Sequence, residues 1–332
     1  MKDTMLAVVA ESASVPLVVK RIARPQPGKG QVLLKVHAAG LNPLDTKIAA
    51  GVAGHARQPL PAVLGLDVAG TVIEVAPDVE HFAVGDEVFG MAGGIGGAQG
   101  AMAEYMAVDA RLIAPKPRRL SMAEAAALPL VFITAWEGLV DRANVGEGLR
   151  VLIHGGAGGV GQVAVQLARA RGAEVYATGA AGSLAFIHAL GATAIDYRAE
   201  THEDYVQRCT DGEGFDIVYD TVGGDTLEAA FHSVKAYTGH VLSCLGWGTH
   251  SLAPLSFRGA SYSGVFTLMP LLTGNGREHH GAILREAAAL VEAGQLGIRL
   301  DTRCFGLAEA NEALRQVAEG RGRGKTVLQV TP

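Results

Sequence analysis

Three glycines follow an apolar run near the middle of the chain. The stretch "VLIHGGAGGVGQVAVQLARARG", residues 151–172, places Gly156, Gly158 and Gly161 in the spacing G-x-G-x-x-G, between a predicted strand and a predicted helix. Glycines at these positions permit a tight turn and a close approach of the backbone to a ligand, while the amides and the dipole of the following helix attract an anion. Residues 156–161 are therefore predicted to bind the pyrophosphate of a dinucleotide.

The next predicted strand ends without an acidic residue. In folds that prefer NAD, an Asp or Glu about 20 residues beyond the first glycine binds the ribose 2′-hydroxyl. Here the segment "ATGAAGS" offers Gly179 and Ser183 instead. A 2′-phosphate meets no repulsion there, and Arg198, Arg321 or Arg323 could supply positive charge from elsewhere in the chain. The pattern therefore favours NADPH over NADH.

Two further segments contain polar residues that could stabilise a developing negative charge. Asn42 and Asp45 lie in "LNPLD", and Thr134 lies in "FITAW". A nicotinamide can pass its hydride to an electron-poor acceptor without a metal if hydrogen-bond donors receive the charge that develops. Both segments also allow a structural interpretation, because Asn-Pro favours a turn and Thr134 with Glu137 has the spacing of a capping box.

The residues before about 120 predict a β-rich domain. Strand-like runs such as "QVLLKVHAAG" and "DVAGTVIEVA" alternate with turn signals such as "RPQPGKGQ" and "FAVGDEVFG". The glycine-rich segment 91–100 is expected to be a flexible loop, either a connector or a lid.

From about residue 120 onward, predicted strands and helices alternate. Ser121 and Glu124 have capping-box spacing and predict a helix start. The alternation that follows is typical of a parallel, doubly wound sheet with helices on both faces. Two helical stretches after residue 270 and the final strand "KTVLQV" could return to the first domain.

Length and composition limit the class of protein. A chain of 332 residues favours two domains. A net charge of -5 gives no reason to expect nucleic acid or an anionic membrane as a partner. We find no signal-peptide pattern, and the longest apolar stretch, "AAALPLVFITAW", is too short to span a bilayer. Three widely spaced cysteines, Cys209, Cys244 and Cys304, suit a reducing cytoplasm.

Several of these motifs, in this order, resemble the medium-chain dehydrogenase/reductase superfamily, in particular its zinc-independent, zeta-crystallin-like quinone oxidoreductase branch. The likeness covers nearly the whole chain, and its matching stretches are "KVHAAGLNPLDTKIAAG", "LGLDVAGTVIEV", "VGDEVFG", "AEYMAV", "LPLVFITAWEGL", "HGGAGGVGQVAVQLAR", "FDIVYDTVGG" and "GKTVLQV".

The resemblance implies an α/β protein with two domains and an active-site cleft between them. Residues 1–122 and 270–332 would form a β-rich, GroES-like substrate domain, and residues 123–269 a Rossmann dinucleotide-binding domain with a doubly wound parallel sheet. It also implies a homodimer, which could form by pairing of sheet edges around "SYSGVFTLM".

The resemblance further implies a set of site residues. Asn42 and Thr134 would lie at the nicotinamide end of the cleft, with Asp45 as a further catalytic candidate. Lys47 departs from the tyrosine of many such reductases, which leaves the shape of the quinone pocket open. The expected cofactor contacts are Lys47, Gly156, Ala157, Gly158, Gly159, Val160, Gly161, Gly179, Ser183, Tyr197, Leu245, Gly246, Phe266, Thr267, Arg321 and Arg323.

Zinc-dependent members of the superfamily need a catalytic Cys near "AAGLNP" and a His-Glu pair near "LGLD". This chain has Gly40 and Leu41 in the first place and Leu66 and Asp67 in the second, and it has no cysteine before Cys209. Since glycine and leucine cannot replace thiolate or imidazole ligands, no catalytic or structural zinc is expected.

The sequence thus predicts an NADPH-dependent, zinc-independent oxidoreductase of quinones or conjugated carbonyls, in the cytoplasm. Two alternatives stay open. A 2-alkenal or enoyl reductase shares these motifs and differs in the lining of its pocket. A non-catalytic, crystallin-like protein would keep the NADPH-binding motifs without turnover.

Overall fold

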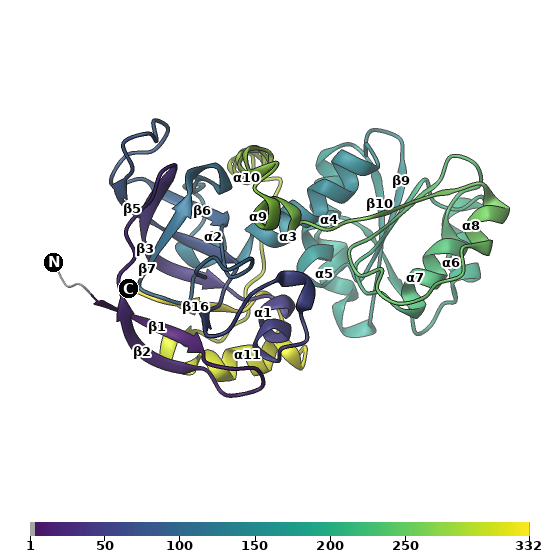
Figure 1. The fold of residues 1–332 in the computed structure, drawn as a ribbon. Coiled ribbons are helices and arrows are strands. Elements are labelled where there is room, and N and C mark those ends of the chain that lie inside the picture. The colour runs from purple at the N-terminus through teal and green to yellow at the C-terminus, as the bar shows by residue number, and fades with distance from the viewer. Residues whose placement is uncertain (1–3, 332) are drawn as a thin grey trace. The chain divides into compact units, whose positions relative to one another are not determined.

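The computed structural model describes residues 4–331, which form two compact units. Unit 1 contains the chain up to Leu130 and from Leu268 onward, and unit 2 contains Val131–Thr267. In Figure 1 the purple N-terminal strands and the yellow C-terminal helix accordingly belong to the same unit. No helix among the described residues is both long and apolar enough to cross a membrane.

Unit 1 is built on two β-sheets. The smaller sheet has the order β2-β1-β4, and its strands are β1 (Thr4–Ala10), β2 (Val18–Ala23) and β4 (Ala62–Val63). The larger sheet has the order β15-β16-β3-β5-β6-β8, with β7 paired to β3. Its strands are β3 (Gln31–Gly40), β5 (Asp67–Val75), β6 (Glu87–Met91), β7 (Tyr105–Asp109), β8 (Ile113–Pro115), β15 (Phe305–Gly306) and β16 (Val327–Gln329). The C-terminal strand β16 pairs antiparallel with β3, so the chain end completes the first domain.

The helices of unit 1 are short except for α10. They are α1 (Pro43–Ala49), α2 (Met122–Ala127), α9 (Met269–Thr273), α10 (Arg277–Glu292) and α11 (Ala310–Ala318), with 3₁₀ turns η1 (Gly54–Ala56), η2 (Ala110–Leu112) and η5 (Leu307–Glu309). The predicted capping box at Ser121 and Glu124 is confirmed at the start of α2. Helix α2 packs against β3 so closely that a Cβ at Gly40 would lie 2.1 Å from the carbonyl oxygen of Ala126. This packing places α2 in unit 1, whose first segment extends to Leu130.

The glycine-rich segment 91–100 is packed and hydrogen-bonded. The amide of Gly96 donates to the carbonyl of Ala56, and the amide of Gly97 donates to the side chain of Gln58. A Cβ at Gly93 would lie 2.1 Å from the carbonyl oxygen of Gln99. The glycines at 93 and 94 serve close backbone packing, and residues 96–98 are exposed. The flexibility of the loop stays a prediction.

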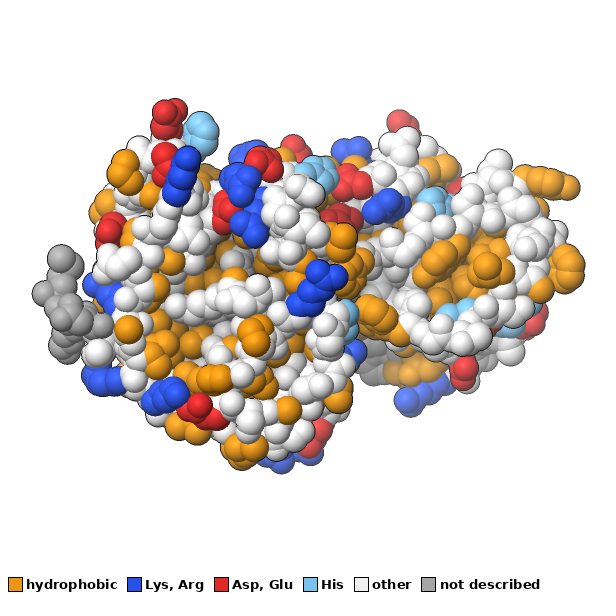
Figure 2. Space-filling model, in the orientation of Figure 1, with side chains coloured by type: hydrophobic (Ala, Val, Ile, Leu, Met, Phe, Trp, Pro, Cys, Tyr) orange, Lys and Arg blue, Asp and Glu red, His pale blue; other side chains and the backbone are white. Residues whose placement is uncertain are grey.

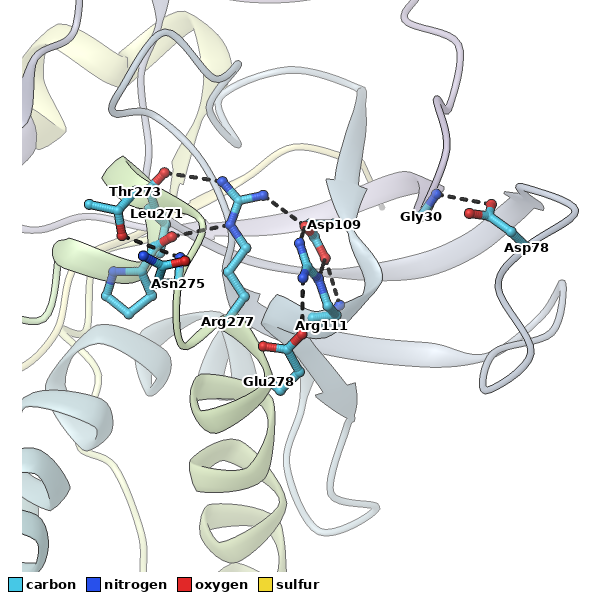
Figure 3. Close-up of polar contacts among 10 residues, drawn as sticks. Gly30, Asp78, Asp109, Arg111, Leu271, Thr273, Asn275, Arg277 and Glu278 are labelled. Carbon is cyan, nitrogen blue, oxygen red and sulfur yellow. Dashed lines mark hydrogen bonds and ion pairs between the residues drawn. The ribbon is translucent and has the colours of Figure 1, made fainter.

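A network of charged side chains links α10 to strand β7 in unit 1 (Figure 3). Asp109 accepts hydrogen bonds from the guanidinium groups of Arg111 and Arg277, and Arg277 also donates to the carbonyls of Pro270 and Leu271. Burial opposes ionisation of Asp109, but these hydrogen bonds outweigh it and lower its pKa to about 2. The carboxylate therefore fixes the segment that returns the chain from unit 2.

Unit 2 contains a six-stranded parallel sheet in the order β11-β10-β9-β12-β13-β14. Its strands are β9 (Arg150–His154), β10 (Glu174–Gly179), β11 (Thr193–Asp196), β12 (Ile217–Asp220), β13 (His240–Ser243) and β14 (Ser261–Gly264). This is the Rossmann order 3-2-1-4-5-6, with the direction of winding reversed between β9 and β12. The predicted doubly wound parallel sheet is confirmed.

The helices of unit 2 connect these strands. They are α4 (Gly159–Ala170), α5 (Leu184–Ala189), α6 (His202–Thr210), α7 (Asp225–Ser233) and α8 (Ala253–Arg258), together with the 3₁₀ turn η4 (Ala181–Ser183). Before β9, helix α3 (Pro129–Trp136) passes into a π-helical segment, Glu137–Arg142. An apolar cluster that includes Phe215, Phe231 and Leu255 fills the space between the sheet and the helices on one side.

Candidate functional site

The glycine turn joins β9 to the N-terminus of α4. Gly158 is the N-cap residue of this 12-residue helix, and its amide donates to the carbonyl of Gly155. A Cβ at Gly161 would lie 2.1 Å from the carbonyl oxygen of Gly155, and one at Gly156 would lie 2.6 Å from Cβ of Ala177. Only glycine fits at these two positions. The turn can therefore present the first amides of α4 to an anion such as a pyrophosphate.

The end of β10 adjoins this turn. A Cβ at Gly179 would lie 2.5 Å from Oγ of Ser183, and the Ser183 hydroxyl donates to the carbonyl of Ala180 at 2.8 Å. Tyr197, directly after β11, donates its amide to the carbonyl of Gly179. The structure thus brings Gly179, Ser183 and Tyr197 together.

A positive charge lies at the same edge. The Arg198 guanidinium lies 5.6 Å from the centre of the Tyr197 ring, and its side chain is exposed. Arg321 and Arg323 belong to unit 1 instead. There, the Arg321 side chain pairs with Glu319, and the Arg323 amide donates to Asp301. Their role in binding the cofactor stays a prediction.

Two polar residues at the ends of β12 and β13 organise the turns that follow these strands. Asp220 is fully buried, accepts hydrogen bonds from the amides of Val222 and Gly223, and accepts one from the Ser243 hydroxyl at 2.7 Å. Ser243 in turn accepts from the amide of Leu245 at 3.1 Å. Neither residue was predicted as part of the site, although each ends a predicted parallel strand, where ligand-facing side chains gather.

Leu245, Gly246, Phe266 and Thr267 follow β13 and β14 at this same carboxyl edge of the sheet. Thr267 is buried, and the Phe266 ring lies edge-on to Trp247 with 6.5 Å between ring centres. The predicted contacts in unit 2 therefore fall into two groups along one edge of the sheet, one at β9–β11 and one at β13–β14.

Thr134 lies inside α3, and its side chain is 5% exposed. Its carbonyl accepts a hydrogen bond of 2.7 Å from the hydroxyl of Tyr219. Because the helix begins five residues earlier, at Pro129, Thr134 cannot be an N-cap residue. The capping-box interpretation of Thr134 and Glu137 is therefore wrong.

In unit 1, Asn42 and Asp45 belong to a buried polar network that also contains Asp67 and Lys325. The Asn42 side chain donates to Asp67 at 2.9 Å and accepts from the Lys325 ammonium, while its amide donates to Asp45 at 2.8 Å. Asp45 also accepts from the amide of Gly65. Asn42 is 1% exposed, and both ends of its side-chain amide are occupied, so it holds the start of α1 in place.

One cation faces two carboxylates in this network. Burial raises the pKa of Asp45 to about 7, with a further contribution from the Asp67 carboxylate, although the amides of Asn42 and Gly65 and the charge of Lys325 oppose the shift. Burial also raises the pKa of Asp67 to about 6, against the opposing effect of Lys325 and the hydrogen bonds from Asn42 and Leu130. Burial lowers the pKa of Lys325, and the two carboxylates counteract it.

Lys47 lies on the outer side of α1, and its side chain is exposed. Its charge adds to the effect of burial in lowering the pKa of His55. Lys47 is therefore a surface cation of unit 1, close to the buried polar network in sequence but outside its hydrogen bonds.

The side chains of the buried polar network in unit 1 do not fit a zinc ion. Asp45 and Asp67 are hydrogen-bonded to backbone amides and to Asn42, and the Lys325 ammonium between them would repel a cation. Within residues 4–331 no group of three or more His, Cys, Asp and Glu side chains could hold a metal ion.

Two family models match parts of this chain. Residues 28–118 match the family described as alcohol dehydrogenase GroES-like domain, and residues 190–328 match the family described as zinc-binding dehydrogenase. The chain is 37% identical over 319 residues to a 2-methylene-furan-3-one reductase of Solanum lycopersicum, which covers 94% of this chain and 74% of the relative.

Solved structures extend the comparison. An alcohol dehydrogenase superfamily protein from Novosphingobium aromaticivorans is 56% identical, with a TM-score of 0.97 over 99% of this chain and 100% of the other. The quinone oxidoreductase from Coxiella burnetii is 32% identical, with a TM-score of 0.83 over 99% and 100% of the two chains.

Proposed function

Since this chain belongs to the medium-chain dehydrogenase/reductase superfamily of oxidoreductases, we propose that it is an NADPH-dependent, zinc-independent reductase of quinones or conjugated carbonyls. The observation that carries the proposal combines two features of unit 2. The turn between β9 and α4 contains positions that only glycine fits, and β10 ends without an acidic residue. Together they favour a phosphorylated dinucleotide.

The proposed binding mode follows from unit 2. The amides of residues 156–161 hold the pyrophosphate at the N-terminus of α4. Ser183, Tyr197 and the adjacent Arg198 would surround the 2′-phosphate. Arg198 would supply positive charge for it, at the edge where NAD-preferring folds have an acid that repels a phosphate. The turns after β13 and β14, with Leu245, Gly246, Phe266 and Thr267, are proposed to hold the nicotinamide end.

When bound, the nicotinamide supplies the hydride, and the protein orients the acceptor and stabilises the charge that develops on its oxygen. Thr134 is our first candidate for this contact. Asn42 and Asp45 are proposed to position the N-terminus of α1, since their polar atoms are already bound within the buried polar network. Lys47 and its exposed ammonium stay a proposed contact for the cofactor.

The acceptor is proposed from chemistry that the relatives share. Their names specify a methylene-furanone in one case and a quinone in the other, and both are conjugated carbonyls. An enal or enoyl substrate is the runner-up, because hydride addition to any of these acceptors places negative charge on a carbonyl oxygen. A non-catalytic NADPH-binding role is the remaining alternative.

A homodimer is proposed from the free side of β14, which ends the sheet order of unit 2. An unpaired edge strand favours pairing with a second chain. Tyr262 on β14 and Phe257 on α8 are exposed large apolar side chains, and Figure 2 shows hydrophobic side chains at the surface of this unit.

The free state of all three cysteines supports the proposed cytoplasmic location.

The test is oxidation of NADPH and NADH by the metal-stripped protein, each with a quinone and with an enal. We expect turnover with NADPH and the quinone well above that with NADH. Arg198→Gln should raise the Kd for NADPH at least tenfold and leave that for NADH unchanged, because one charge-assisted contact is worth about 1.5–3 kcal/mol. Arg208→Gln, which breaks an exposed ion pair with Glu200 in the same unit, is the matched control and should change neither.

Three outcomes would overturn parts of the proposal. Equal affinity for the two cofactors in the wild type would remove the NADPH preference. Faster turnover of the enal would transfer the assignment to an alkenal reductase. Tight binding of NADPH without turnover of either acceptor would favour the binding role.

A further inference from the structure

Helix α3 changes its winding directly after the turn that contains Thr134. Residues Glu137–Arg142 are π-helical, and the amide of Ala143 donates to the carbonyl of Gly138, five residues earlier, at 3.1 Å. π-helical segments are rare, and they are frequent at functional sites. A wide turn of this kind needs support from outside the helix, because its hydrogen bonds are less favourable than those of an α-helix.

That support comes from the central strand β12. The side chain of Tyr219 is fully buried, and its ring lies against the backbone of Gly138. A Cβ at Gly138 would lie 2.8 Å from Cζ and 3.0 Å from the hydroxyl oxygen of Tyr219. The absence of a side chain at position 138 therefore creates the space in which this tyrosine lies.

The Tyr219 hydroxyl then donates to the carbonyl of Thr134 at 2.7 Å. Burial raises the pKa of this phenol well above its usual value, with further contributions from Cys244, Glu137 and Asp220, so the hydroxyl stays protonated and remains a donor. One tyrosine thus contacts both the last α-helical turn and the first π-helical turn.

We infer that Tyr219 is a positioning residue for Thr134, acting through the carbonyl of Thr134 and the space at Gly138. The inference rests on the proposed function, in which Thr134 contacts the reacting groups. If the hydroxyl is removed, the segment after Thr134 can return to an α-helical register. A shift by one residue rotates the part of the helix after the change by about 100° relative to the part before it, so the Thr134 side chain loses its fixed orientation relative to the residues that follow.

The experiment compares Tyr219→Phe with Tyr205→Phe. Tyr205 is also buried in unit 2, and its hydroxyl contacts His154 and Ser233, away from α3. Each variant removes one buried phenol hydroxyl, so both should lower the melting temperature by a similar few degrees. Only Tyr219→Phe should lower kcat for the quinone, about tenfold, with the Kd for NADPH unchanged.

Two further measurements separate positioning from a general loss of stability. Hydrogen exchange of the peptide 129–145 should be faster in Tyr219→Phe and unchanged in Tyr205→Phe. In a double-mutant cycle, Thr134→Val should cost less in the Tyr219→Phe background than in the wild type, because both changes affect one contact.

The inference is overturned if Tyr219→Phe has the kcat of the wild type. It is also overturned if the losses of kcat in Tyr219→Phe and Thr134→Val simply multiply in the double variant, or if peptide 129–145 exchanges equally fast in Tyr219→Phe and Tyr205→Phe. If the wild type turns over neither acceptor, the proposed function fails instead, and the exchange comparison still decides whether Tyr219 holds the turn at Thr134.

Discussion

Lys325 is the cation of the buried polar network, and its position explains why Asn42 is held so firmly. Its ammonium donates to the carbonyl of Leu41 and to the side chain of Asn42, and it lies near the carboxylates of Asp45 and Asp67. Buried charges are tolerated where partners and hydrogen bonds compensate for lost hydration. The network therefore depends on every member being present.

Lys325→Met should destabilise unit 1 by about 3–5 kcal/mol, because it leaves two buried carboxylates without their counter-charge. The measurement is hydrogen exchange of peptides from β3 and β5 as urea is increased. Lys20→Met is the control, since Lys20 pairs with Glu11 at the surface of the same unit and should cost less than about 1 kcal/mol. Equal losses in the two variants would contradict the role given to Lys325.

The turn between β9 and α4 depends on two glycines that accept no side chain. Gly161→Ala would place a Cβ 2.1 Å from the carbonyl oxygen of Gly155, so the turn or the helix must move. We expect a loss of about 3 kcal/mol in the free energy of unfolding of unit 2 and a Kd for NADPH raised more than tenfold, because the amides of α4 are displaced.

Unfolding in urea, followed by the fluorescence of Trp136 and Trp247, and NADPH titration check this prediction. Gly146→Ala is the matched control in unit 2. A Cβ there would meet only the carbonyl oxygen of Asn144, at 4.0 Å, so stability and affinity should stay close to wild type. A Gly161→Ala protein with normal affinity would show that the amides of α4 do not hold the cofactor.

The elements that could be predicted from the sequence are those set by local pattern. The Rossmann strands, helix α4 and the capping box of α2 follow from hydrophobic periodicity, glycine spacing and side-chain caps. The one error in this group is the cap at Thr134, because its spacing to Glu137 does not show that the helix already begins at Pro129. The hydrogen bonds of segment 91–100 to Ala56 and Gln58 follow from no local pattern, because these residues are distant in the sequence.

The candidate site was predictable to the same extent. The glycine turn is local, and the structure has it where the pattern indicates. Lys325 and Asp67 were missed as partners of Asn42, because they lie 283 and 25 residues away in the chain. No periodicity or spacing links residues that only the sheet brings together.

N-terminal and C-terminal segments of the described residues pair with each other in unit 1. Strand β16 pairs with β3, and Asn311 of α11 exchanges hydrogen bonds with the backbone of Leu17. Arg277 binds Asp109 just after the chain returns from unit 2 (Figure 3). Unit 1 is therefore built from both of its sequence segments, and an ion pair between Arg277 and Asp109 joins them.

Asp109 on the one hand, and Asp45 and Asp67 on the other, give the stability of unit 1 opposite dependences on pH. Asp109 has a folded pKa of about 2, below its unfolded value, so its contribution is present above about pH 4 and is lost as the pH falls. Asp45 and Asp67 have folded pKa values of about 7 and about 6, above their unfolded values. The folded state then binds more protons than the unfolded state between about pH 4 and 7, and stability falls as the pH rises through this window.

We therefore expect the stability of unit 1 to be highest near pH 4–5, lower at pH 8, and lower again below pH 3. Hydrogen exchange of β3 and β5 in urea, corrected for the intrinsic exchange rate at each pH, measures this profile. Asp109→Asn should flatten the acidic side alone, because it removes the carboxylate that Arg111 and Arg277 stabilise. Lys325→Met should steepen the fall between pH 5 and 8, because the two buried carboxylates lose the cation that lowers their pKa values. A wild-type profile that rises steadily from pH 4 to pH 8 would mean that Asp45 and Asp67 ionise normally, and the buried polar network would then need access to water.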